Sequence, residues 1–135
     1  MYEIKKFKFK KDRLGSIRNY RYGENWPVVY ILENGKEAYI GETNTAYRRS
    51  NQHYGNTERS KLESLFIIAD DEYNKSATLD IESSLIRYMA GDGKYLLQNG
   101  NSGIQESNYY DRERYQAKFE IIWDELKSCE LLKMI

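Results

Sequence analysis

The chain has 135 residues, of which 40% are hydrophobic and 31% are charged, and its formal net charge is zero. This length favours one domain, and the composition supports a packed core under a charged surface rather than a disordered chain. No apolar run approaches the roughly 18 residues that span a membrane, and residues 1–6 lack the apolar core of a signal peptide. The single cysteine, Cys129, excludes an internal disulfide and fits a reducing compartment, so we expect a cytoplasmic protein.

Positive charge is concentrated near the N-terminus. Residues 1–25 hold eight Lys or Arg and three acidic residues, a net charge of +5 that leaves −5 for the rest of the chain. Phe7 and Phe9 alternate with lysines, which predicts a half-buried strand. Two roles for this basic segment are equally compatible with the pattern: an arm that contacts phosphates, or the solubilising outer face of an edge strand.

Two short apolar runs flank Asn34-Gly35, which is the strongest short-range signal for a β-hairpin. If these two residues form a type I′ turn, Tyr30 lies directly opposite Tyr39 on one face of the sheet, with Cβ atoms about 5 Å apart. Such a pair can be plain packing, because tyrosine favours strands. The arginine and the histidine that follow make packing alone a less sufficient explanation.

A short helix is predicted over residues 44–54, with Asn44 as its N-cap and Gly55 at its end. Arg49 and His53 are four residues apart and therefore share a face of this helix. After a polar loop, the apolar run at residues 65–69 has the length of a strand and predicts a buried central one.

A second helix is predicted from a cap at Ser76 to about Met89. Glu82 lies among its apolar positions, three residues from Leu79 and Leu85 and four from Ile86. A carboxylate in that position is costly unless it is paired, bound to a metal or placed at a cleft. The alternative is a boundary glutamate whose stem packs while its head reaches water.

The last third of the chain reads as a turn at residues 91–93, a short extended piece at 95–101, and a long helix from about Ser107 or Asn108. Its apolar stripe indicates core packing or a partner surface, and consists of Tyr115, Phe119, Ile122, Leu126 and Cys129. The end of the chain, residues 131–135, is unusually apolar. We therefore expect the chain to be a piece of a longer protein.

Six residues form a set suited to phosphodiester hydrolysis: Tyr30, Tyr39, Arg49, His53, Glu82 and Asn99. A tyrosine can take a proton from water, and a histidine can orient water, contact phosphate or protonate a leaving group. An arginine stabilises a phosphoryl group that gains negative charge. A glutamate offers Mg²⁺ the hard oxygen ligand that it prefers, and the asparagine can tie strands together or anchor the glutamate. One cysteine and one histidine make a zinc site within the chain a poor alternative.

These residues resemble the GIY-YIG nuclease domain in order and spacing. Val28-Val29-Tyr30 stands for the first motif and Tyr39-Ile40-Gly41 for the second, and the resemblance covers residues 27–101. The family's arginine, which follows eight residues after the glycine, falls on Arg49, and its frequent histidine falls on His53. Its glutamate falls on Glu82, and its asparagine falls on Asn99, with Asn101 as an alternative.

The resemblance implies an α+β fold, a small three-stranded antiparallel sheet flanked by helices. To this core the chain would add a basic N-terminal extension at residues 1–26 and a C-terminal helix at about 107–133, all within one domain of residues 1–135. The resemblance also implies one Mg²⁺ or Mn²⁺ ion on Glu82, arginine stabilising the transition state, and a tyrosine helping to activate water, with a weak preference for Tyr30. Two positions depart from the family: Val28 replaces a glycine, and Glu42 stands where many members carry lysine, which adds negative charge near DNA.

The sequence around Tyr39-Ile40-Gly41-Glu42-Thr43 also resembles the version of this domain that is fused N-terminally to a schlafen-like P-loop ATPase or helicase-like domain in bacteria. The expected function is therefore metal-dependent endonuclease cleavage of DNA, with that C-terminal domain as a partner in the full-length chain. The rival is a non-catalytic module that binds nucleic acid or another domain. A third interpretation is that the tyrosines merely pack and Glu82 is a surface acid.

Overall fold

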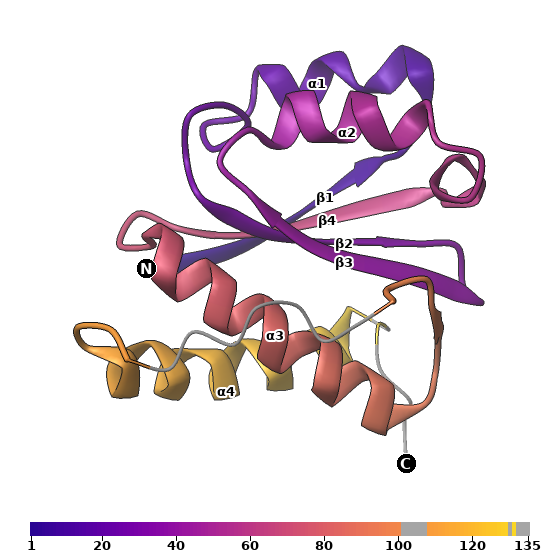
Figure 1. Ribbon diagram of the computed structural model, residues 1–135. Helices are drawn as coiled ribbons and strands as arrows, with labels where there is room; N and C mark the ends of the chain where they lie inside the picture. Colours follow the sequence, from indigo (N-terminus) through magenta and orange to yellow (C-terminus); the bar gives the residue numbers. More distant parts are fainter. Residues whose placement is uncertain (101–107, 130, 132–135) are drawn as a thin grey trace.

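The computed structural model describes residues 1–100, 108–129 and 131. Figure 1 shows three layers, in which a twisted sheet lies between two layers of helices. The α1–α2 layer contains α1 (Gly15–Arg18) and α2 (Ala46–Tyr54), together with the short 3-10 helices η1 (Lys11–Arg13) and η2 (Arg59–Lys61). The α3–α4 layer contains α3 (Lys75–Asp92) and α4 (Arg112–Ser128) on the opposite face of the sheet.

The sheet has five strands in the order β1-β4-β2-β3-β5. Their bounds are β1 (Tyr2–Lys8), β2 (Val28–Glu33), β3 (Glu37–Thr43), β4 (Ser64–Asp70) and β5 (Leu96–Leu97). The α+β class is confirmed, and an antiparallel trio, β4-β2-β3, lies at the centre. The expectation of only three strands is wrong, because the basic N-terminal segment adds β1 along β4 and the piece after α3 adds β5 parallel to β3.

The β2–β3 hairpin forms, but its register differs from the predicted one by a two-residue shift. Tyr30 lies opposite Gly41, and Tyr39 lies opposite Leu32. The Asn34 side-chain Oδ1 accepts hydrogen bonds from the backbone N–H groups of Lys36 and Glu37, at 3.0 and 2.8 Å, which makes Asn34 the first residue of the turn. Gly35 then takes the first central position with φ of +88°, as a type II′ turn requires. Because side chains alternate with period two, this shift leaves both tyrosines on one face.

The predicted helices are present, with corrected ends. The helix predicted at residues 44–54 is α2, whose N-cap is Thr45 rather than Asn44. Helix α3 is capped by Asn74, whose side chain accepts from the Ala77 N–H, and not by Ser76. It continues through the expected turn at 91–93 to a left-handed Gly93. Helix α4 begins at Arg112, later than expected, after Asp111 in a left-handed conformation.

Both faces of the sheet are covered by apolar cores. In β2, Val28, Tyr30 and Leu32 face the α1–α2 layer, whereas Val29 and Ile31 face the α3–α4 layer. Most of the predicted stripe of α4 is buried in the core between the sheet and the α3–α4 layer. Leu79 is not part of the apolar face of α3, which is formed by Ala77, Ile81, Leu85, Ile86 and Met89.

No helix among the described residues is both long enough and apolar enough to cross a membrane.

Candidate functional site

Tyr30 is held over a glycine at the centre of the sheet. A Cβ atom placed on Gly41 would lie 2.3 Å from the Tyr30 hydroxyl oxygen and 2.4 Å from Cζ, so only glycine leaves room for this ring. Tyr30 is 3% exposed, and its burial raises the pKa of its phenol. The positive charge of Arg49 acts against that rise. The close approach of Tyr30 therefore explains why the third residue of the Tyr39-Ile40-Gly41 motif is a glycine.

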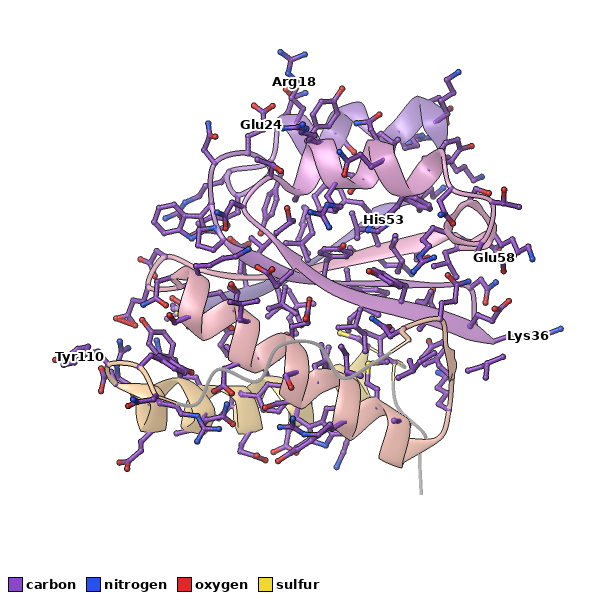
Figure 2. All side chains as sticks on the ribbon, viewed as in Figure 1. Arg18, Glu24, Lys36, His53, Glu58 and Tyr110 are labelled. Carbon is purple, nitrogen blue, oxygen red and sulfur yellow. The ribbon has the colours of Figure 1, made fainter. Side chains whose placement is uncertain are left out.

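His53 lies between the two tyrosines. Its Nε2 is 2.6 Å from the Tyr30 hydroxyl oxygen, and its ring centroid is 5.0 Å from that of Tyr39. Figure 2 shows His53 on the side of α2 that faces the sheet. Burial lowers the pKa of His53 to about 4, helped by the charges of Arg49 and Arg59. The ring is therefore neutral near pH 7, and a ring nitrogen can accept the hydrogen bond from the phenol.

Arg49 lies on the same face of α2 as His53 and is exposed to solvent. It makes no ion pair among the described residues, although its charge acts on the pKa values of Tyr30, His53 and Glu82. A hydrogen bond from its side chain also opposes the rise in the pKa of the Tyr30 phenol. Arg49 therefore lies near groups of β2, α2 and α3, and it has no acidic partner in the described part of the chain.

Glu82 is a half-buried carboxylate of α3, near Glu42 of β3. Burial and the nearby carboxylate of Glu42 together raise the pKa of Glu82 to about 7, although a backbone hydrogen bond at Glu42 and the charges of Lys75 and Arg49 oppose that rise. No ion pair of Glu82 is found in the described part of the chain. A half-buried acid with another acid as its neighbour is a group that a cation would stabilise.

Glu42 has its own partner, which changes the meaning of this departure from the resembled family. Lys75 donates to both of its carboxylate oxygens, at 2.8 and 2.6 Å, and Thr78 approaches one of them at 3.4 Å. The expected addition of negative charge next to DNA is therefore largely cancelled. The positive charge of Lys75, the first residue of α3, offsets the negative charge of Glu42.

Asn99 closes the ladder where β5 ends. Its Oδ1 accepts from the Ile40 N–H at 3.0 Å, and its Nδ2 donates to the Ile40 carbonyl at 2.7 Å. Of the two predicted roles, tying strands together matches these contacts. Strand β5 pairs with Glu37 and Ala38, and Asn99 extends this connection to Ile40. The alternative asparagine, Asn101, lies outside the described residues.

The donor set fits a hard divalent ion with few protein ligands. No group of three or more His, Cys, Asp or Glu suited to a metal occurs among the described residues, which argues against a cage made entirely by the protein. Mg²⁺ commonly uses one or two carboxylates, several waters and substrate phosphate oxygens. Glu82 can supply that carboxylate, since it is half-buried and has the carboxylate of Glu42 nearby, and a cation would favour its charged form.

Two features of the structure were not found from the sequence. Asp80 is fully buried and accepts hydrogen bonds from Tyr109, Arg112 and Gln116, at 2.8, 3.0 and 2.6 Å. Arg59 lies 4.1 Å from the centroid of the Tyr39 ring. Neither residue has a sequence pattern of its own, because Asp80 resembles any helix acid and Arg59 begins a 3-10 helix of only three residues.

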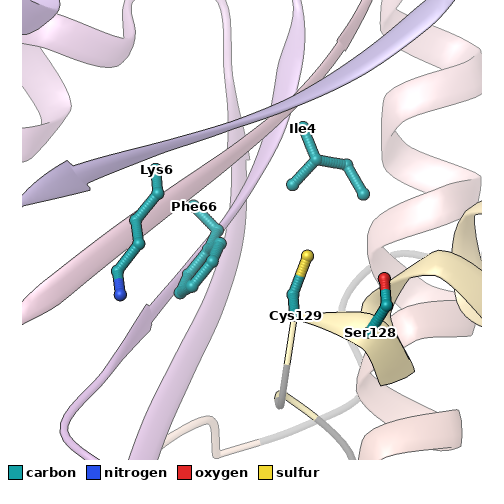
Figure 3. A pocket seen from close by; sticks show the side chains of 5 residues that line it. All are labelled: Ile4, Lys6, Phe66, Ser128 and Cys129. Atoms are coloured by element: carbon teal, nitrogen blue, oxygen red, sulfur yellow. The ribbon is translucent and has the colours of Figure 1, made fainter.

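A cavity of about 300 Å³ lies away from these residues. Figure 3 shows its lining, contributed by the first strand, by Phe66 of β4 and by the end of α4: Ile4, Lys6, Phe66, Ser128 and Cys129. A second cavity, of about 400 Å³, is lined by Tyr109 and the start of α4. Neither of these two cavities is lined by a predicted site residue.

No protein-family model matches the chain, and neither a curated protein nor a solved structure matches it.

Proposed function

We propose that this protein is a metal-dependent endonuclease that hydrolyses DNA phosphodiester bonds, as its resemblance to the GIY-YIG nuclease domain implies. The observation that carries the proposal is the 2.6 Å contact between the Tyr30 hydroxyl and His53 Nε2, within electrostatic reach of Arg49 and Glu82. These four residues come from three separate elements, β2, α2 and α3, and only Arg49 and His53 are neighbours along the chain. Plain packing would not require an unpaired arginine and a destabilised carboxylate beside the same buried phenol.

In the proposed reaction, Tyr30 and His53 move a proton together. Burial disfavours a free phenolate at Tyr30, so the phenol oxygen takes a proton from water as its own proton passes to His53 Nε2. The neutral state of His53, given its pKa of about 4, leaves Nε2 able to receive that proton. The hydroxide oxygen then bonds to phosphorus as the bond to the leaving oxygen breaks. This arrangement supports Tyr30, rather than Tyr39, as the base.

Arg49 and Glu82 would handle the charge of the reaction. Arg49 donates to the phosphoryl oxygens as they gain negative charge. Glu82 would hold Mg²⁺ or Mn²⁺, which when bound polarises the phosphate and the leaving oxygen. Tyr39 forms the wall of the site beside His53, and Asn99 keeps the β3 edge in place.

Cleavage of supercoiled plasmid in Mg²⁺ or Mn²⁺, with EDTA as the negative condition, tests the proposal. Glu82→Gln keeps the size of the side chain and removes the charge, and we expect it to slow cleavage on the order of 10³-fold, since a metal contributes several kcal/mol. Asp124→Asn is the matched control, because Asp124 is an exposed acid of the α3–α4 layer. Equal rates for all three proteins would contradict the site, and no cleavage by the wild type would leave the rival binding module.

A further inference from the structure

Arg59 is fixed in place beside the candidate site. The Asn56 side chain accepts hydrogen bonds from the backbone N–H groups of Glu58 and Arg59, at 3.0 and 3.1 Å, and the Arg59 carbonyl accepts from Leu62 N–H at 3.0 Å. Leu62 is buried in the core under the α1–α2 layer. The loop that presents Arg59 is thereby anchored at both of its ends.

The guanidinium of Arg59 stacks on an aromatic ring and is not neutralised by an acid. It lies 4.1 Å from the centroid of Tyr39, the ring that borders His53, and its charge lowers the pKa of His53. Its Nε is buried without a hydrogen-bond partner, and no ion pair involves it within the described part of the chain. Lys61, two residues later, does pair with Glu58, so an acid is available locally but is used by another cation.

An unpaired cation in a half-buried position is costly unless an anion joins it. Stacking on Tyr39 covers the flat face of the guanidinium and leaves its edge donors in a plane, which is the arrangement that recognises phosphate. The neighbouring side chains of Arg49 and His53 already provide for the scissile phosphate. The anion available to Arg59 is then a second phosphate of the same nucleic-acid strand.

We propose that Arg59 binds a non-scissile phosphate of the nucleic-acid backbone, so that the substrate is a polynucleotide and not an isolated phosphodiester. This inference rests on the proposed function for its choice of ligand. Arg59 is a binding residue in this account, and the chemistry at the scissile phosphate does not require it.

Binding of a short fluorescein-labelled DNA duplex in EDTA, measured by anisotropy over a series of salt concentrations, tests this directly. Arg59→Gln should weaken affinity about tenfold at low salt and reduce the slope of log K against log salt by about one, as the loss of one phosphate contact does. Arg59→Lys should restore the slope, because it keeps the charge, whereas a purely structural role of the stack would not be rescued by lysine. Arg87→Ala removes the same charge from the opposite layer and should change affinity less than twofold.

Measurements of activity and binding together distinguish failure of the Arg59 assignment from failure of the proposed function. With bis(p-nitrophenyl) phosphate, which has a single phosphodiester, Arg59→Gln should leave KM unchanged, while KM for DNA rises. Because the charge of Arg59 also lowers the pKa of His53, any change in kcat should be the same on both substrates. Equal affinity and slope for wild type and Arg59→Gln, or an equal rise of KM on both substrates, would overturn the assignment. Absence of cleavage by the wild type would contradict the proposed function and still leave the salt dependence to decide on Arg59.

A wild-type measurement covers the case in which Arg59→Gln does not fold. The Nε–Hε resonance of Arg59 in an NMR spectrum should shift on addition of the duplex, and that of Arg87 should not. An unshifted Arg59 resonance at saturating duplex would contradict the proposal.

Discussion

The two helical layers use their positive charges differently. In the α3–α4 layer, five cations pair with acids: Lys75 with Glu42, Arg112 with Asp80, Arg114 with Glu72 and Asp111, Lys118 with Asp70 and Glu72, and Lys127 with Asp124. Arg87 of this layer donates to Ser83, and Arg114 also lies over the Tyr115 ring. In the α1–α2 layer, Lys61 has an acidic partner, whereas three arginines lie over tyrosine rings instead: Arg18 over Tyr47, Arg21 over Tyr22 and Arg59 over Tyr39.

Charge counts agree with this difference. Residues 10–27 and 44–63, which build the α1–α2 layer, hold nine Lys or Arg and four acids, a net charge of +5. Residues 71–95 and 108–129, which build the α3–α4 layer, hold seven and ten, a net charge of −3. The zero net charge of the whole chain therefore conceals one face suited to a polyanion and another in which charges serve the fold. Glu82 departs from the second pattern, because it is a half-buried acid without an ion pair.

The largest expected effect is on activity, from the α1–α2 layer. Arg49→Ala should slow DNA cleavage by about 10²- to 10³-fold, because one donor to the developing charge is lost. Its stability should stay within about 1 kcal/mol of the wild type, since the side chain is exposed, has no ion pair among the described residues, and loses only its hydrogen bond to the Tyr30 phenol. Plasmid cleavage rates and urea unfolding measure the two quantities, and a large loss of stability would place Arg49 in the fold instead.

In the α3–α4 layer, removal of a cation should affect stability rather than activity. Arg112→Met removes the cation that pairs with the fully buried Asp80 and should lower the free energy of unfolding by about 3 kcal/mol. Tyr109 and Gln116 remain as partners of Asp80, so the protein should still fold. The cleavage rate per folded molecule should be unchanged. A variant as stable as the wild type but inactive would break the proposed division between the layers.

Alanine substitutions at two glycines, Gly41 and Gly91, test the close contact between Tyr30 and β3. Gly41→Ala should destabilise the protein by about 1–3 kcal/mol through overpacking and reduce activity, because Tyr30 must move away from His53. Gly91→Ala is the matched control, since a Cβ there meets nothing within 4 Å inside α3, and should be neutral or slightly stabilising. Thermal unfolding of both variants measures the contrast, and equal stability for the two would contradict the close contact.

The smallest expected effect is the pH dependence that His53 contributes. Its pKa is about 4 in the folded protein and about 6.5 when unfolded, so the unfolded state binds more protons between these values. The contribution of His53 to stability is complete above pH 6.5 and is lost as pH falls toward 4. Between pH 7 and pH 5 the loss should be about 1 kcal/mol, allowing for partial solvent exposure. Urea unfolding at both pH values should show a smaller loss for His53→Gln, and an equal loss would exclude His53 as its source.

The central elements of the fold could be predicted because periodicity and turn residues act locally. The β2–β3 hairpin, the buried β4 and the apolar stripe of α4 all follow from such signals. The register of the hairpin could not, because the Asn34 side chain bonds forward to Lys36 and Glu37 and thereby moves the turn by one residue. A strand at β1 and an extended piece at β5 were expected, but their partners β4 and β3 were not, since strand pairing between distant segments leaves little local trace.

In the candidate site, too, the relations within one element could be predicted and those between elements could not. Arg49 and His53 share a helix face, and that relation follows from spacing alone. The pairing of Lys75 with Glu42 depends on how α3 packs against β3, which no local pattern specifies. The position of Arg59 over Tyr39 likewise depends on how the short 3-10 helix η2 packs against β3, which no local pattern specifies.

A crystal soaked with Mn²⁺ tests the central claim most directly, because anomalous scattering locates the ion without reference to activity. The account predicts an anomalous peak at the Glu82 carboxylate, on the side of the site that Arg49 and Tyr30 share. A fully occupied peak elsewhere on the molecule, or no peak at Glu82 in crystals that bind Mn²⁺, would contradict it.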